Sequence, residues 1–136
     1  MKIEHLAIWS ENIETLKEFY VRYFGANANG KYTNPSKGFE SYFLSFDSGA
    51  RLEIMQMANI PANKNDPMKQ YTGLIHFAMS VDSKQRVDEL TDTLKADGYR
   101  VVDGPSVPRQ TVCNLLSFSL PRFTFSKMSL ADLVHM

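Results

Sequence analysis

Two segments, residues 3–9 (IEHLAIW) and 74–81 (LIHFAMSV), decide the fold that this sequence predicts. Each places one histidine among apolar residues and leads into an amphipathic stretch that ends at a glycine. The two histidines, His5 and His76, are 71 positions apart. Because one short unit occurs twice with a metal-binding residue type at the same place, the residues indicate a metal site between two similar halves. They do not name a reaction.

The composition is typical of a single globular domain. Of its 136 residues, 43% are hydrophobic and 22% charged, so the chain can bury a substantial core. Fifteen basic and fifteen acidic residues cancel, which argues against a nucleic-acid or anionic-membrane partner. No apolar run approaches the ~20 residues that span a bilayer, and Glu4 and His5 interrupt any signal-peptide pattern. The single cysteine, Cys113, fits a reducing cytoplasm, where we expect the protein.

The first half begins with a strand and a helix. Residues 2–9 alternate with a period of two, which predicts a strand with His5, Ala7 and Trp9 on one face. Apolar residues then recur every three or four positions over 13–24, which predicts a helix. Ser10 or Asn12 is suited to cap the start of this helix, and Gly25 its end.

The rest of the first half is predicted as a loop, a hairpin and a linker. Residues 26–38 are rich in Asn, Gly, Pro and Lys and are expected to form a mobile loop. Residues 39–47 and 51–57 look like the two strands of a hairpin. Residues 58–72, with two prolines, are the natural linker between the halves.

The second half repeats the order of elements and then departs from it. Residues 73–81 are predicted as a strand, Asp82 or Ser83 caps a helix that closes at Gly98, and 99–103 form a short strand. From residue 112 onward there is no Gly and no Glu, and the local signals disagree; 112–120 fits a strand and 130–135 a helical turn.

This order of strands and helices predicts an α+β fold with helices packed against two small mixed sheets. We expect one structural domain, made of a first module (residues 1–57), the linker (58–72), a second module (73–120) and an atypical C-terminal tail (121–136).

The candidate metal ligands are His5, His76 and Glu53. The histidines would point from equivalent strands, and Glu53 shares a strand face with Arg51, Met55 and Met57. A carboxylate within such an apolar strand is costly to bury unless it is paired or bound to a cation. Two imidazoles and one carboxylate suit zinc, nickel, iron or another divalent first-row metal. Three protein ligands with open positions are typical of a catalytic metal site.

Each candidate also has a structural interpretation. A lone histidine on a strand is usually a hydrogen-bonded core or rim residue, and Glu53 alone would lie exposed at a sheet edge. The repeated placement of the two histidines strengthens the metal site to the point where it and these structural interpretations both stay open. Cys113 is interpreted as a buried apolar residue, and His135, beside the last residue, as no ligand. The sequence has no G-x-G-x-x-G, G-x-x-x-x-G-K or C-x-x-C motif.

The same residues carry a resemblance to a known family. Several segments carry it: the opening I-E-H-L-A-I-W-S-E-N followed by L-K-E-F-Y-x-x-Y-F-G, then R-L-E-I-M, then G-L-I-H-F-A-M-S-V and a helix running to D-G-Y. Together they resemble the vicinal oxygen chelate superfamily. This is the glyoxalase and bleomycin-resistance fold. The likeness covers residues 1–110.

The resemblance implies paired βαβββ modules whose curved sheets enclose a divalent metal. Glyoxalase I-like members take ligands from the first strand and a later strand of each module, and His5, Glu53 and His76 match three of these four positions. The likeness is closest to bacterial lactoylglutathione lyases, which use nickel or zinc and isomerise a glutathione hemithioacetal; iron and manganese are alternative metals. Such proteins imply a small-molecule substrate and a homodimer. The proton-transferring base would be Glu53 or a residue that the sequence does not identify.

The sequence departs from the family at its fourth ligand. That ligand should be a glutamate in the last strand, in a segment like D-P-x-G-N-x-I-E, which this chain lacks. The position 71 residues after Glu53 is Thr124, and no glutamate follows Glu89. The hypothesis is that the tail past residue 111 is out of frame or diverged. Two alternatives to the lyase therefore stay open: a non-catalytic binder like the bleomycin-resistance proteins, and an iron-dependent ring-cleaving dioxygenase.

Overall fold

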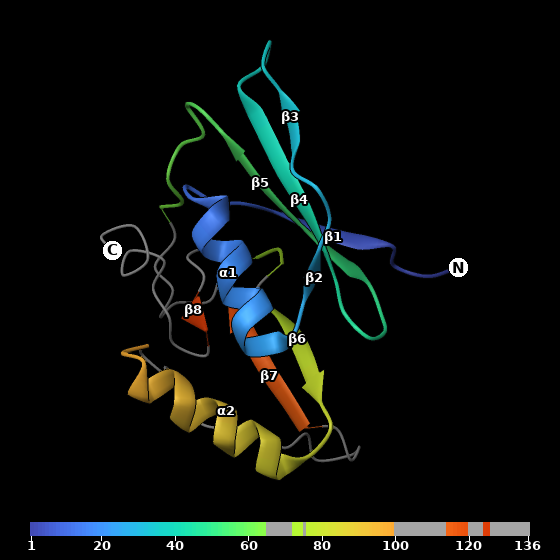
Figure 1. Cartoon of the computed structure of the whole chain (residues 1–136), viewed down its shortest axis with the longest axis vertical. Helices are drawn as coiled ribbons and strands as arrows, with labels where there is room; N and C mark the ends of the chain where they lie inside the picture. The colour runs from blue at the N-terminus through green and yellow to red at the C-terminus, as the bar shows by residue number, and fades with distance from the viewer. Residues whose placement is uncertain (65–71, 75, 100–113, 120–123, 126–136) are drawn as a thin grey trace. The chain divides into compact units, whose positions relative to one another are not determined.

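The structure is a computed structural model in which residues 1–64, 72–74, 76–99, 114–119 and 124–125 are described (Figure 1). The chain divides into two compact units, Met1–Pro61 and Ala62–Met136, and each unit is described by itself. That the two units form one domain joined by a linker stays a prediction. Among the described residues, no helix is long and apolar enough to cross a membrane.

The first unit is a mixed sheet with one helix. The strand order is β1-β5-β4-β2, with β3 pairing with β4 outside this path. β1 runs parallel to β5, whereas all the other pairs are antiparallel. The elements are β1 (His5–Trp9), α1 (Ile13–Phe24), β2 (Asn27–Ala28), β3 (Tyr32–Asn34), β4 (Phe39–Ser45) and β5 (Arg51–Met57). The predicted helix and hairpin are confirmed.

The core of the first unit lies between α1 and one face of the sheet. Along β5, Leu52 and Ile54 are buried, while Arg51, Glu53 and Met55 on the opposite face are partly exposed. The helix packs against β4 and β5. The period of two in the strands and the apolar stripe of the helix therefore meet in one core. Its buried residues include Ile8, Ile13, Leu16, Phe19, Tyr20, Tyr23, Leu44, Leu52 and Ile54.

The structure corrects the prediction of a loop over residues 26–38. Two short strands, β2 and β3, lie within it, and both pair with β4. The surrounding sequence is rich in turn-forming residues, and two or three residues are too few to show an alternating pattern, although Tyr32 and Thr33 are types that favour strands. The first strand also begins later than expected, at His5 instead of residue 2.

The second unit contains an antiparallel sheet of order β6-β7-β8 and one helix among its described residues. The side chain of Ser83, one of two residues expected to cap this helix, accepts a hydrogen bond from the Arg86 N–H. The elements are β6 (His76–Val81), α2 (Lys84–Ala96), β7 (Asn114–Ser119) and β8 (Thr124–Phe125). β6 begins at His76 and not at residue 73. The predicted strand at 99–103, apart from Tyr99, and the helical turn at 130–135 lie outside the described residues.

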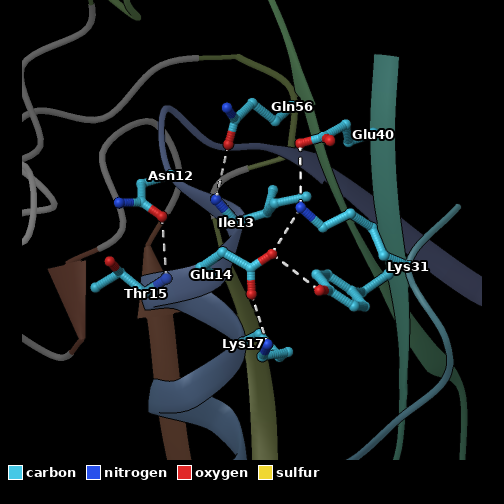
Figure 2. Close-up of polar contacts among 9 residues, drawn as sticks. Asn12, Ile13, Glu14, Thr15, Lys17, Lys31, Glu40 and Gln56 are labelled. Carbon is cyan, nitrogen blue, oxygen red and sulfur yellow. Dashed lines mark hydrogen bonds and ion pairs between the residues drawn. The ribbon is translucent and has the colours of Figure 1, made fainter. Parts of the chain in front are cut away.

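Two side chains outside α1 satisfy backbone donors at its first turn. Asn12 is the N-cap, and its side-chain oxygen accepts from the Thr15 N–H at 3.1 Å. The side-chain oxygen of Gln56, at the end of β5, accepts from the Ile13 N–H at 3.0 Å (Figure 2). The first N–H groups of a helix have no partner within it, so these two bonds stabilise the helix start and tie it to the sheet.

Glu14 joins the helix to the sheet electrostatically. Its carboxylate accepts from the Tyr42 hydroxyl at 2.9 Å and pairs with Lys31 at 2.8 Å and Lys17 at 2.5 Å (Figure 2). Lys31 also reaches Glu40 on β4, at 3.4 Å. The hydrogen bonds from Lys17, then Lys31 and Tyr42, lower the pKa of Glu14 to about 2. The same bonds raise the pKa values of Lys17 and Lys31.

The cap assignment leads to the first prediction. Asn12→Ala should lower the free energy of unfolding by ~1 kcal/mol, because it leaves the Thr15 N–H without its side-chain acceptor. Ser10→Ala, at the other candidate cap, should cost clearly less. Urea unfolding followed by circular dichroism measures both. Equal losses would contradict the assignment of Asn12 as the cap.

The second prediction concerns acid stability. The folded-state pKa of Glu14 lies below its ordinary value of 4.5, so its contribution is present above that pH and is lost as the pH falls toward about 2. Glu14→Gln should therefore destabilise the protein at about pH 6 and change its stability much less at about pH 2. Glu18→Gln, on the exposed face of the same helix, is the control. An equal effect of Glu14→Gln at both pH values would refute this role.

Candidate metal centre

The parallel pairing of β1 with β5 places His5 and Glu53 on the same face of the first sheet. In the register of the two strands, His5 lies opposite Arg51, and Ala7 opposite Glu53. Side chains two positions apart on a strand share a face, so His5 and Ala7 stand beside Arg51 and Glu53. This face is the one that α1 does not cover, since the buried Leu52 and Ile54 point to the other.

The two side chains approach each other. His5 Nε2 lies 3.8 Å from Glu53 Oε2, with 39% of the His5 side chain and 16% of the Glu53 side chain exposed. Two ligands bound to one zinc-like cation at about 2.0–2.2 Å are themselves about 3.0–3.5 Å apart. Small side-chain rotations would bring the two atoms to that distance. An imidazole nitrogen and a carboxylate oxygen are also the donor types such cations prefer, so the pair fits a divalent metal.

Glu4 binds both His5 and Arg51. One carboxylate oxygen of Glu4 contacts His5 Nδ1, and the other accepts from Arg51 Nε at 2.6 Å and from Arg51 Nη2. The hydrogen bond to His5 is the main cause of a lowered pKa for Glu4, and Arg51 adds to it. About half of the Glu4 side chain is exposed.

The sequence pattern did not single out Glu4. Strict alternation over residues 2–9 would place it on the face opposite His5. Because β1 begins only at His5, Glu4 lies just outside the strand and its side chain is free of that alternation. A carboxylate next to a candidate ligand is the only signal that the sequence offered.

An aromatic ring borders this group. Phe43 on β4 lies opposite Glu53, contacts the His5 ring edge-on at 5.4 Å between centroids, and lies beneath the Arg51 guanidinium at 4.2 Å. The face continues with Trp9 and Phe39, whose rings are 5.9 Å apart. Phe43 therefore gives the pair of donors one apolar neighbour.

The third predicted ligand belongs to the other unit. His76 is the first residue of β6, where its backbone lies opposite Ser119. The structure thus brings together His5 and Glu53, and a site completed by His76 stays a prediction. Within the described residues, no group of three or more His, Cys, Asp or Glu side chains is arranged to hold one metal ion. Cys113 and His135 lie outside the described part of the chain.

The fold and this pair define an α+β protein with a mixed sheet that carries metal-type donors on the face that α1 does not cover. The chain belongs to the glyoxalase/bleomycin resistance protein/dioxygenase superfamily, whose family model matches residues 2–111. The predicted family and fold class are confirmed. The match ends at the residue where the sequence stops following the pattern of the family. No curated protein matches the chain.

Solved structures show the same fold at low sequence identity. A glyoxalase family protein from Enterococcus faecalis is 23% identical with a TM-score of 0.65, and the match covers 93% of each chain. Glyoxalase I of Leishmania major is 12% identical, with a TM-score of 0.56 and 99% and 91% of the two chains covered. A V278E variant of glyoxalase I from Zea mays is 13% identical with a TM-score of 0.57; the match covers 93% of this chain but 42% of the maize chain.

Proposed function

We propose that the protein is a divalent-metal-dependent lyase of the glyoxalase I type, in which His5, Glu53 and His76 hold the cation. The approach of His5 Nε2 to Glu53 Oε2 carries this proposal. Membership of the superfamily supports it, and glyoxalase I enzymes are among the similar structures. Nickel or zinc is the expected cation, with iron or manganese as alternatives.

Glu53 has the chemistry of both a ligand and a proton carrier. A divalent cation, when bound, polarises oxygen atoms of the substrate. In a hemithioacetal of glutathione, Glu53 would take the proton from the carbon that bears sulfur and hydroxyl and return it to the adjacent carbonyl carbon. The hydroxyl proton passes to the former carbonyl oxygen, and the product is a hydroxy thioester. Atoms and electrons balance within the substrate, so no oxidant is needed.

The surroundings of the pair suit a small oxygenated substrate. Phe43 and Met55 lie on the same sheet face as Glu53 and would border the substrate, and Phe77 on β6 is the corresponding candidate in the second unit. The apolar side chains on this face, which α1 does not cover, are consistent with its closure by a second module or a second subunit, so the proposal includes a homodimer. It also includes a cytoplasmic location, because the chain has a single cysteine.

A non-catalytic binding protein of the same fold is the second candidate. One observation favours it: no glutamate follows Glu89, so the fourth ligand and proton carrier of glyoxalase I-like members has no counterpart in this sequence. Such a protein would hold a small molecule without converting it. The retained pair of His5 and Glu53 favours the lyase instead.

The third prediction tests the metal centre. Protein freed of metal by a chelator should bind one Ni²⁺ per chain in isothermal titration calorimetry. His5→Ala and His76→Ala should each weaken binding by more than ~100-fold, because loss of a direct ligand exceeds the 10- to 100-fold effect of an outer-shell residue. His135→Ala, the third histidine, is the matched control and should bind as the wild type does. Unchanged affinity in His5→Ala would refute the proposed centre.

The fourth prediction separates the lyase from the binder. Nickel-loaded protein should convert the hemithioacetal of methylglyoxal and glutathione, and Glu53→Gln should abolish this turnover, because an amide does not accept a proton in the reaction. Elemental analysis of each sample measures the bound metal. Full metal occupancy without turnover in the wild-type protein would contradict the lyase with this substrate and favour the binder.

A further inference from the structure

The two oxygens of Glu4 have separate partners. Arg51 holds one through Nε at 2.6 Å and through Nη2, and His5 Nδ1 contacts the other. The backbone adds a further link, since the Arg51 N–H donates to the Glu4 carbonyl oxygen at 2.9 Å. Both the backbone and the carboxylate of Glu4 are thus fixed against β5, the strand that carries Glu53.

We propose that Glu4 is a positioning residue for the metal ligand His5: it accepts the Nδ1–H of the imidazole and thereby turns the Nε2 lone pair toward Glu53. This inference rests on the proposed metal centre. A carboxylate accepts hydrogen bonds and donates none, so the nitrogen that faces Glu4 must carry the proton. In neutral imidazole the other nitrogen then has none and is free to bind a cation.

The opposite side of the ring shows why this arrangement fits a cation. His5 Nε2 faces Glu53 Oε2 at 3.8 Å. With the proton on Nδ1, two acceptors confront each other across that gap, which is unfavourable unless a positive charge lies between them. A cation satisfies both. Outer-shell carboxylates of this kind fix the tautomer and orientation of metal-bound histidines and raise their basicity.

Ring packing restrains the same imidazole. The Phe43 ring meets the His5 ring edge-on. The Arg51 guanidinium that holds Glu4 lies over the face of the Phe43 ring. Arg51 therefore acts on His5 by two routes, through Glu4 and through Phe43. Glu4 is about half-exposed, so its loss should alter the state of His5 without unfolding the protein.

The test measures the tautomer of His5 and the metal affinity separately. Long-range ¹H–¹⁵N spectra of metal-free protein at about pH 9, where ordinary histidines are neutral, report which ring nitrogen carries the proton. His5→Ala identifies the His5 signals. The wild type should show the proton on Nδ1, and Glu4→Ala should shift the population toward Nε2 and weaken Ni²⁺ binding by ~10- to 100-fold.

Two further variants make the test specific. Glu4→Gln keeps an oxygen that can accept the Nδ1–H, so it should retain more of the wild-type tautomer and affinity than Glu4→Ala. Glu18→Ala removes an exposed glutamate on α1 and should change neither measurement. Circular dichroism checks that each variant is folded.

The outcomes distinguish this inference from the proposed function. If wild-type protein binds Ni²⁺ but Glu4→Ala leaves both tautomer and affinity unchanged, the positioning role is wrong and the metal centre stands. A wild-type His5 with its proton on Nε2 would also overturn the inference. If wild-type protein binds none of Ni²⁺, Zn²⁺, Fe²⁺ and Mn²⁺, the proposed function fails and the role of Glu4 toward a metal fails with it, whichever ring nitrogen of His5 carries the proton.

Discussion

The candidate site depends on the parallel pairing of β1 with β5. These strands are far apart in the sequence, and their register places Ala7 opposite Glu53 and His5 opposite Arg51. A shift of one residue would turn His5 to the face that α1 covers, because side chains alternate along a strand. The buried Ile8 on β1 resists such a shift, since the shift would turn it to the exposed face. Core packing on one face thus holds the donors together on the other.

The spacing of apolar residues predicted those helices and strands that are long enough to show a regular pattern. The helix from Ile13 to Phe24 followed from apolar residues that recur every three or four positions. The shared face of Arg51 and Glu53 followed from the alternation of side chains along a strand. The short strands β2 and β3 did not, because two or three residues are too few to show an alternating pattern; both strands are hydrogen-bonded to β4.

The candidate site, like the fold, was predictable only where its residues belong to a regular strand pattern. His5 and Glu53 were named as candidates because each lies among apolar residues of a strand and because His76 repeats the first histidine. Glu4 was missed because alternation no longer applies to a residue outside the strand, where the orientation of a side chain depends on its tertiary partners. Its partner Arg51 comes from a distant strand, so no local pattern could reveal the pairing.

The two donors differ in how firmly the backbone holds them. Glu53 lies on β5, which is hydrogen-bonded to β1 on one side and β4 on the other, whereas within the described first unit β1 is paired only with β5. Edge strands open at lower free energy than inner ones. Detachment of β1 would therefore carry the imidazole away while the carboxylate stays in place. Release of a cation held by the proposed pair would then need only the fraying of β1 and not the unfolding of the whole sheet.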